Sequence, residues 1–349
     1  MQIQDLMKKV GGKGGNMTVF KSVVKANHVL PGHNNIVVSV SGGSDSDIII
    51  DLIYRMSLIL NKKITYVWFD TGIEYDATKR HLKYLEDRYG IEIIREKAIK
   101  PIPTACKEYG QPFLSKMVSG QICSLQKNGF KWEDKPFEEL VLEYPKIRSG
   151  IAWWCNYRDT KDFGYSMFNI DYNKHLKEFL IANPPTFPIA NKCCKYAKKD
   201  VSKEIIKKYN CDLLITGIRK AEGGIRSVNY KTCFSDNGTE CDTFRPIFWY
   251  HDEDKKFYEE KFEIVHSDCY TKYGMRRTGC AGCPYNRKLN EDLSIMEQYE
   301  PKLYKAVTNI FAESYAYTKK YREFCADKQN SQSAKQIPLF EIPDDNKDG

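Results

Sequence analysis

The sequence predicts an α/β protein with a doubly wound, mainly parallel sheet. Apolar, β-branched runs at 36–40 and 64–69 have the character of buried strands, and apolar residues recur at helical spacing between them. An amphipathic helix at 78–89 leads into a third strand at 91–95, and a fourth strand is expected at 212–216. Helices that alternate with apolar strands are typical of a parallel sheet covered on both faces.

Helical regions are expected around and within this sheet. The proline-rich and aromatic stretch at about 99–190 interrupts the strand pattern and predicts a helical insertion. The predicted organisation is an N-terminal helical extension at 1–34, a main domain at 35–290 with the insertion inside it, C-terminal helices at 291–327, and a mobile polar tail at 328–349.

Composition restricts the class of protein. With 349 residues, 42% hydrophobic and 29% charged, the chain can bury a full core. No apolar run approaches the roughly 20 residues of a membrane span, and the polar start does not resemble a signal peptide, so we expect a cytoplasmic protein without membrane contact. Twelve cysteines in such a chain favour thiolate chemistry or metal ligation over disulfides. The net charge of +8 suits an anionic ligand but arises from an ordinary balance of 54 basic and 46 acidic residues.

A glycine pair directly after the first strand predicts a phosphate-binding loop. It lets the chain turn sharply and brings backbone N–H groups close to an anion, while the next helix adds its positive N-terminal end. Serine hydroxyls supply further donors, and the Gly-Lys-Ser/Thr ending of a Walker A loop is missing. A turn that merely caps the helix is the alternative. The loop consists of Ser41, Gly42, Gly43, Ser44, Asp45 and Ser46.

Two more polar blocks follow strands, where open α/β sheets bind ligands. The first is Asp70-Thr71-Gly72 with Glu74, and the second begins at Gly217 and contains Arg219 and Arg226. Arginines can make forked, charge-assisted contacts to phosphate or sulfate, although surface ion pairs would use the same residues.

Two cysteine pairs could together hold a metal. Cys193 and Cys194 are adjacent, and Cys280 and Cys283 form a Cys-x-x-Cys turn. Four thiolates suffice for a [4Fe–4S] cluster or a zinc ion. Adjacent ligands suit the separate irons of a cluster better than one tetrahedral zinc ion, and unligated cysteines are the third alternative.

The motifs resemble those of a known family. Ser-Gly-Gly-Ser-Asp-Ser after a strand is similar to the PP-loop of the adenine nucleotide alpha hydrolase superfamily. The Asp70 and Arg219 blocks resemble the phosphoadenosine phosphosulfate (PAPS) reductase family, which includes the ATP pyrophosphatases of DNA phosphorothioation systems. The resemblance covers about 35–290 except the insertion. The tandem and spaced cysteines are similar to the cluster ligands of adenylyl-sulfate reductases.

The resemblance implies an adenine nucleotide, ATP with Mg²⁺, and a [4Fe–4S] cluster with zinc as the alternative. Asp45 would help to hold Mg²⁺, and Arg219 and Arg226 would neutralise phosphate oxygens. The preferred function is an ATP pyrophosphatase that adenylates a substrate for sulfur transfer, because Asp45 is kept. The substrate would be a nucleic acid or a small molecule, and a cysteine desulfurase is a candidate sulfur donor.

Two alternatives remain. A reductase would release sulfite from adenylyl sulfate or PAPS, but the tail reads Glu323-Phe324-Cys325-Ala326 where the resemblance implies Glu-Cys-Gly. The other alternative is a nucleotide-binding subunit without turnover.

A stripe of lysines could receive a nucleic-acid backbone or be a solvated face. The sequence predicts no oligomeric state. The stripe comprises Lys192, Lys195, Lys198, Lys199, Lys203 and Lys207.

Overall fold

The computed structural model describes residues 2–157, 166, 168–223, 230–238 and 240–335. Arg226 and residues 336–349 of the predicted tail lie outside the described residues. The chain forms two compact units, Met1–Glu108 with Lys192–Ile310 and Tyr109–Asn191 with Phe311–Gly349. Each unit is described by itself.

The first unit is built on a six-stranded sheet of order β3-β2-β1-β4-β6-β5. All neighbouring strands are parallel except β5, which pairs antiparallel with β6 at the edge. From β1 the chain continues to β2 and β3 on one side of the sheet, and it then crosses to β4 on the other side of β1. A topological switch point therefore lies between β1 and β4. The strands are β1 (Ile36–Val40), β2 (Ile64–Asp70), β3 (Ile93–Lys97), β4 (Leu213–Ile215), β5 (Phe234–Ser235) and β6 (Asp242–Phe244).

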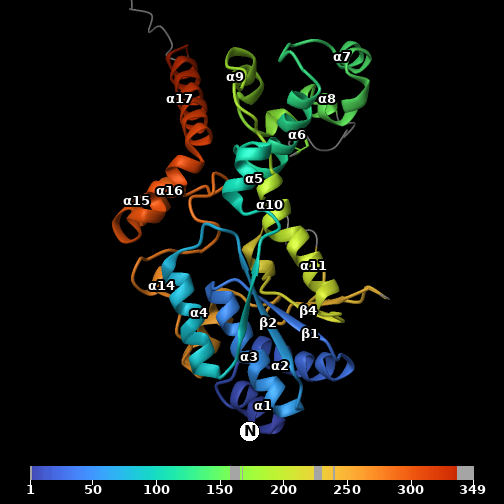
Figure 1. Ribbon diagram of the computed structural model, residues 1–349, viewed down its shortest axis with the longest axis vertical. Helices are drawn as coiled ribbons and strands as arrows, with labels where there is room; N and C mark the ends of the chain where they lie inside the picture. The colour runs from blue at the N-terminus through green and yellow to red at the C-terminus, as the bar shows by residue number, and fades with distance from the viewer. Residues whose placement is uncertain (1, 158–165, 167, 224–229, 239, 336–349) are drawn as a thin grey trace, which may run out of the picture. The chain divides into compact units, whose positions relative to one another are not determined.

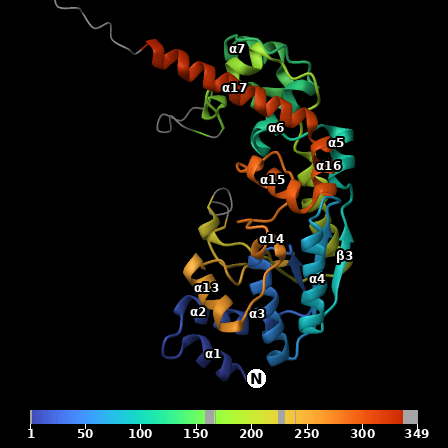
Figure 2. The ribbon, with the colours of Figure 1, turned by 90° about the vertical axis from the view of Figure 1, so that its left-hand side faces the viewer.

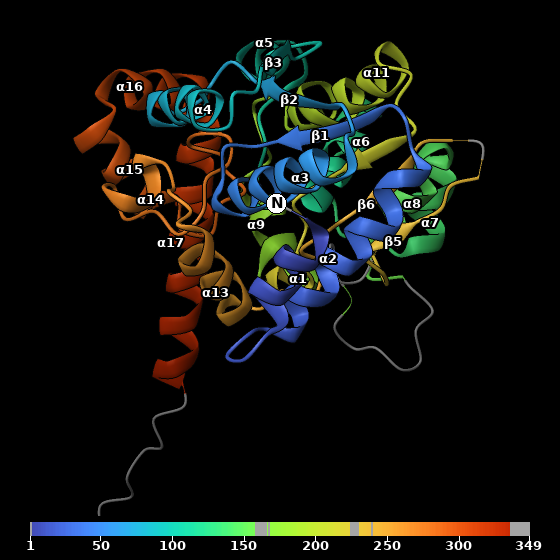
Figure 3. The ribbon, with the colours of Figure 1, turned by 90° about the horizontal axis from the view of Figure 1, so that it is seen from below.

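Helices cover the sheet of this unit on both faces, which confirms the doubly wound fold; α3 and α11 lie on opposite sides of it (Figure 3). Figure 1 shows α3, α4 and α11 beside the strands, and Figure 2 shows α3 and α4 from another side. The helices of the unit are α1 (Ile3–Gly11), α2 (Met17–Val29), α3 (Ser44–Leu60), α4 (Asp76–Tyr89), α5 (Ile102–Tyr109), α10 (Lys192–Cys194), a π-helical turn (Lys195–Lys199), α11 (Asp200–Lys208), α13 (Asp252–Phe262), α14 (Asp268–Thr271), α15 (Leu289–Tyr299) and α16 (Pro301–Ile310).

Local sequence explains where several helices begin and end. Asn16 caps α2, since its side-chain oxygen accepts hydrogen bonds from the N–H groups of Thr18 and Val19. Asn61 ends α3 and Gly90 ends α4, both in the left-handed conformation that these residue types adopt readily. Val38 of β1 and Val67 of β2 are completely buried, as expected for central strands of a sheet covered on both faces.

The second unit is helical and has an aromatic core. Trp153 and Trp154 are fully buried in it, and the indole N–H of Trp154 donates to the Glu133 carbonyl at 2.9 Å. Tyr317 and Tyr321 of the last helix pack on Phe179, with ring centroids 5.0 and 5.2 Å apart. The unit's helices are α6 (Lys116–Lys127), α7 (Phe137–Glu143), α8 (Arg148–Trp154), α9 (Leu176–Ala182) and α17 (Ala312–Lys335).

Among the helices described, none combines the length with the apolar character that a membrane span requires.

Candidate active site

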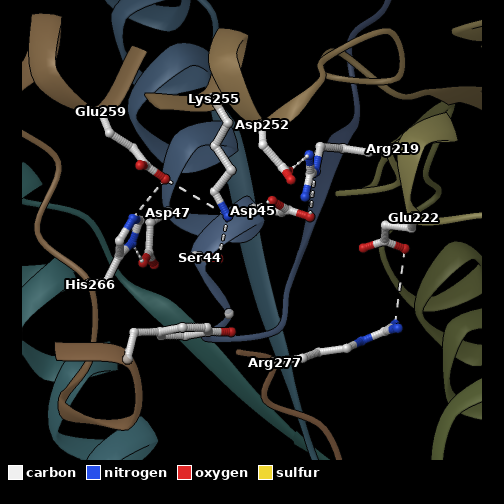
Figure 4. A network of polar contacts seen from close by, with 12 residues as sticks. Ser44, Asp45, Asp47, Arg219, Glu222, Asp252, Lys255, Glu259, His266 and Arg277 are labelled. Carbon is white, nitrogen blue, oxygen red and sulfur yellow. Dashed lines mark hydrogen bonds and ion pairs between the residues drawn. The ribbon is translucent and has the colours of Figure 1, made fainter. Parts of the chain in front are cut away.

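A polar cavity of about 510 Å³ opens at the carboxyl ends of the strands, at the switch point of the first unit. The loop after β1 forms its floor, and segments after β2 and β4 contribute the residues beside it. The helix α13 and the stretch 270–279 add further side chains (Figure 4). The cations among the lining residues are Lys198, Arg219, Lys255, Arg276 and Arg277, and the carboxylates are Asp45, Glu74 and Glu222. The cavity therefore offers an excess of positive charge to a ligand.

The loop after β1 is shaped by its own hydroxyls and by a glycine. The backbone N–H of Ser41 donates to Ser46 Oγ at 3.1 Å, and that of Gly43 donates to Ser41 Oγ at 3.3 Å. Gly42 has a φ of +70°, and a Cβ there would lie 2.5 Å from Thr78 Cγ2. Only glycine fits this turn without displacing α4, and α3 starts immediately after it with its N-terminus at the cavity.

Asp45 is held between two cations from distant parts of the chain. Its carboxylate lies 3.1 Å from Arg219 Nε and 2.9 Å from Lys255 Nζ. Burial alone would raise the pKa of Asp45, but Lys255 and Arg219 outweigh it and lower the pKa. Asp45 is thus an ionised carboxylate at the start of a helix, and the remaining charge of Arg219 is met by exposed Asp252 at 2.8 Å.

The block after β2 folds into a tight turn. Asp70 Oδ1 accepts from the N–H of Gly72 at 3.0 Å, and Glu74 accepts from both the N–H and the hydroxyl of Thr71. Thr71 and Glu74 line the cavity. Burial raises the pKa of Glu74, partly offset by the hydrogen bonds from Thr71.

The block after β4 packs tightly against the loop helix. A Cβ on Gly217 would lie 3.3 Å from Ile49 Cδ1 of α3, so a larger residue would require the Ile49 side chain to shift by a few tenths of an ångström. The shielded hydroxyl of Thr216 has no hydrogen-bond partner among the residues described and belongs to a residue of the cavity wall.

The stretch 270–279, which contains two arginines, lies against the phosphate loop. Tyr270 and Thr278 hydrogen-bond through their hydroxyls at 2.9 Å, and both would lie 3.2 Å from a Cβ on Gly43. Arg277 lies 4.0 Å from Glu222, and it stands with Arg219 and Lys255 around the space in Figure 4.

The four predicted cysteine ligands interact with one another. Burial raises the pKa of Cys283 to about 12, and the charges of Cys280 and Cys194 add to the effect. A hydrogen bond with Cys106 of α5 raises the pKa of Cys193. Among the described residues, however, no three His, Cys, Asp or Glu side chains form a group that could hold a metal ion. Thiols are the donors that a [4Fe–4S] cluster or a zinc ion takes, but in this structure the four cysteines are not gathered into a metal site.

Comparison with known proteins connects this cavity to a family. Residues 35–128, which include the phosphate loop and the Asp70 block, match the phosphoadenosine phosphosulfate reductase domain. This segment belongs to the PAPS reductase family. The match confirms the resemblance drawn from the motifs and relates the chain to enzymes of nucleotide and sulfur chemistry.

Individual relatives share limited parts of this chain or have low identity with it. An uncharacterized protein of Methanocaldococcus jannaschii is 34% identical over 113 residues, which are 32% of this chain and 22% of that protein. The PAPS reductase of Candida auris, in a phosphate complex, is 12% identical with a TM-score of 0.38, over 74% of this chain and 86% of its own. The U34-tRNA thiolase NcsA of Methanococcus maripaludis, with its [4Fe–4S] cluster, is 14% identical with a TM-score of 0.37. The match covers 86% of this chain and 78% of the thiolase.

The fold brings most of the predicted nucleotide-site residues to one cavity of the first unit. Gly42, Asp70 and Gly72 shape the turns behind its wall and are not among its lining residues. Predicted residues that line the cavity are Ser41, Gly43, Ser44, Asp45, Ser46, Thr71, Glu74, Gly217 and Arg219.

Several residues of the site were missed by the sequence reasoning. Lys255 lies on an acidic helix with no motif around it, so nothing in the sequence pointed to it. Arg276 and Arg277 lie just two residues before the Cys-x-x-Cys turn, and this basic, glycine-containing stretch was a signal that could have been used. Lys198 was assigned to the lysine stripe, whereas it lines the cavity and interacts with Cys280.

Proposed function

We propose that this chain is an ATP pyrophosphatase that adenylates an acceptor for sulfur transfer. Support comes chiefly from Asp45, an ionised carboxylate at the phosphate loop that two cations hold at the cavity. An unpaired carboxylate in that position would repel the nucleotide's anionic groups, so its place at the phosphate loop suits a site that binds a metal cation together with the phosphates. With Mg²⁺ on the phosphates, the same carboxylate becomes a ligand of the metal.

The residues present fit a magnesium ion bound in this way. Mg²⁺ is commonly held by one or two carboxylates together with substrate phosphates and water, so a single Asp45 is sufficient. Bound Mg²⁺ would supply charge neutralisation on the pyrophosphate. Arg219 and the loop N–H groups would hold phosphate oxygens, and Arg226 is proposed as a second arginine for the same purpose.

The proposed step is displacement at the α-phosphorus. An acceptor oxygen forms a bond to this phosphorus, and the bond from phosphorus to the oxygen bridging the α- and β-phosphates breaks. Pyrophosphate leaves with the bonding electron pair, and the acceptor's proton passes to solvent. A sulfur nucleophile then takes the place of the adenylated oxygen, and AMP leaves. The chain's contribution is to orient the phosphates and to stabilise the charge of the departing pyrophosphate.

Adenine would occupy the less polar part of the cavity. Val40, Trp68 and Phe69 line it next to the phosphate loop, and they give a planar base an apolar surface. The phosphate loop and the cations of the cavity suit phosphates, so the cavity has both kinds of surface that a nucleotide needs.

Cys193, Cys194, Cys280 and Cys283 would hold a [4Fe–4S] cluster, or zinc as the alternative. A cluster at this place would bind or pass sulfur, or keep the C-terminal part of the unit in position. A cysteine desulfurase would be a suitable donor, and a nucleic acid or a small molecule the acceptor. A cytoplasmic location is part of the proposal.

The second candidate is a reductase that releases sulfite from adenylyl sulfate or PAPS, which the family match favours. Its nucleophile would have to come from Cys325, because that cysteine alone lies in the C-terminal Glu-Phe-Cys-Ala segment. Cys325 is part of α17, and its thiol donates to the carbonyl of Lys174 at 3.5 Å. The first candidate needs no such cysteine and is therefore preferred.

The experiment compares products. Anaerobically purified protein is incubated with ATP and Mg²⁺ plus tRNA, DNA or small acceptors, and separately with adenylyl sulfate or PAPS plus thioredoxin. Pyrophosphate release that depends on an acceptor in the first reaction supports the pyrophosphatase. Sulfite in the second alone would replace it with the reductase. Tight nucleotide binding with neither product would leave a nucleotide-binding subunit.

A further inference from the structure

A row of charged side chains connects the interior of the first unit with the phosphate loop. The reaction proposed above assigns no role to these side chains. Asp47 is completely buried in α3, and His266 Nδ1 lies 2.7 Å from its Oδ2. The other ring nitrogen, Nε2, lies 2.8 Å from Glu259 Oε1 of α13. Glu259 in turn lies 3.8 Å from Lys255 Nζ, one helical turn away, and Figure 4 shows the four side chains in sequence.

Lys255 ends this chain at the loop. Its ammonium contacts Asp45 at 2.9 Å and donates to Ser44 Oγ, so two consecutive loop residues and Glu259 surround it. Its side chain is only 15% exposed, and the residue lines the cavity. A lysine ammonium is a compact charge on a flexible stem, which can change partners without a change in the backbone.

The charges around the loop cannot all keep their partners when a nucleotide binds. Asp45 is paired with both Arg219 and Lys255, and it cannot serve Mg²⁺ and two cations equally. A polyphosphate brings several anionic oxygens to the same place. With Mg²⁺ and polyphosphate bound, Lys255 and Arg219 would exchange their ion pairs with Asp45 for contacts with phosphate, and the Asp45 carboxylate would be free to hold the metal.

We propose, on the basis of the nucleotide role put forward above, that Lys255 is a phosphate-binding residue which Asp45 neutralises in the ligand-free protein. Glu259 is its positioning residue, and His266 fixes Glu259 in turn through its position against Asp47. The site thus carries its own counter-ion when empty. It presents both a cation and a freed carboxylate when Mg²⁺ and polyphosphate arrive together.

Neighbouring side chains of α13 provide matched controls. Lys256 is 75% exposed and pairs with Glu260 at 3.8 Å, the same spacing as the Lys255 and Glu259 pair. Lys256→Gln removes a positive charge from the same helix without touching the cavity, and Glu260→Gln does the same for a negative charge. Any effect of overall charge appears in these controls as well.

The experiment measures binding of inorganic pyrophosphate and of ATP with Mg²⁺ by isothermal titration calorimetry, using the full chain. Loss of one charge-assisted contact predicts at least tenfold weaker binding of either probe to Lys255→Gln, against less than twofold for Lys256→Gln. Glu259→Gln is expected to weaken binding about threefold in the wild-type background and to have no further effect in Lys255→Gln. A Glu259 that merely supported the fold would act equally in both backgrounds.

Circular dichroism and thermal unfolding of each variant show whether it is folded. If Lys255→Gln is poorly folded, Lys255→Arg is measured in its place; it keeps the charge and should retain most of the wild-type affinity. Folded Lys255→Gln that binds pyrophosphate within twofold of wild type overturns the proposal, as does wild-type protein that binds neither probe. Binding with the predicted pattern but no pyrophosphate release from ATP contradicts the pyrophosphatase while the role of Lys255 stands.

Discussion

The guanidinium of Arg219 lies 3.1 Å from the carboxylate of Asp45, although 174 residues separate them in the sequence. The contact joins the loop after β1 to the segment after β4, which are neighbours only because these two strands pair in the sheet. Lys255 completes the arrangement from α13. The sheet order thus builds a site whose charges come from three separate parts of the chain.

Replacing Gly42 with alanine should distort the phosphate loop. The φ of +70° is unfavourable for alanine, and the new Cβ would lie 2.5 Å from Thr78 Cγ2. We expect a loss of about 2–3 kcal/mol in the free energy of unfolding, measured by urea denaturation. Gly32→Ala is the control, since a Cβ there meets nothing within 4 Å, and it should change stability by less than about 0.5 kcal/mol. Equal effects of the two substitutions would contradict the described turn.

Stability should depend on pH through His266. Burial lowers its pKa, but Asp47 and Glu259 outweigh this and raise the pKa to about 9. Because the folded-state pKa is above the unfolded value of 6.5, the contribution to stability is complete below pH 6.5 and is lost as the pH rises through 9. Two other groups lie near His266. The centroid of the Tyr270 ring lies 5.8 Å from that of the imidazole, and His81 contacts the same Asp47 carboxylate.

The measurement compares wild type with His266→Gln by urea unfolding between pH 6 and pH 9.5. The stability advantage of wild type should fall by about 2 kcal/mol over this interval, after allowance for screening by solvent. An advantage that stays constant, or grows with pH, would show that the imidazole is not the charged partner of the two carboxylates.

The cysteine assignment predicts the metal content. Wild-type protein purified without oxygen should be brown and contain iron and sulfide in equal amounts, and Cys280→Ala or Cys283→Ala should lose most of both. Cys123→Ala, in α6 of the second unit, is the control and should retain them. Iron analysis and the absorption spectrum give the readout. Colourless protein with zinc would select the alternative, and metal-free protein would reject both.

Strands and loops were predictable where the signal is local. The apolar runs that became β1 and β2 are long enough to identify, and β4 was found within one residue at each end. The structure begins β3 at Ile93, two residues after the predicted start, because Ile91 and Glu92 still belong to the connection from α4. The strands β5 and β6 are only two and three residues long and have no periodicity to detect.

Contacts between distant segments could not be predicted. Lys255 lies on a helix whose sequence looks like a solvated acidic surface, and only the fold brings it to Ser44 and Asp45. The same is true of Cys106, whose hydrogen bond with Cys193 depends on how α5 meets α10. Sequence motifs therefore identify the loop and the ligand class, while the counter-charges of the site depend on tertiary packing.

The most direct test of the account is Mg²⁺-dependent pyrophosphate release from ATP by wild type and Asp45→Asn. Asparagine keeps the size of the side chain but removes the charge that would hold the metal, so we expect release to fall at least about a hundredfold. The control is Asp87→Asn, an exposed partner of Lys83, which should not change the rate. Release by Asp45→Asn at the wild-type rate, or wild-type release independent of Mg²⁺, would contradict the central role given to Asp45.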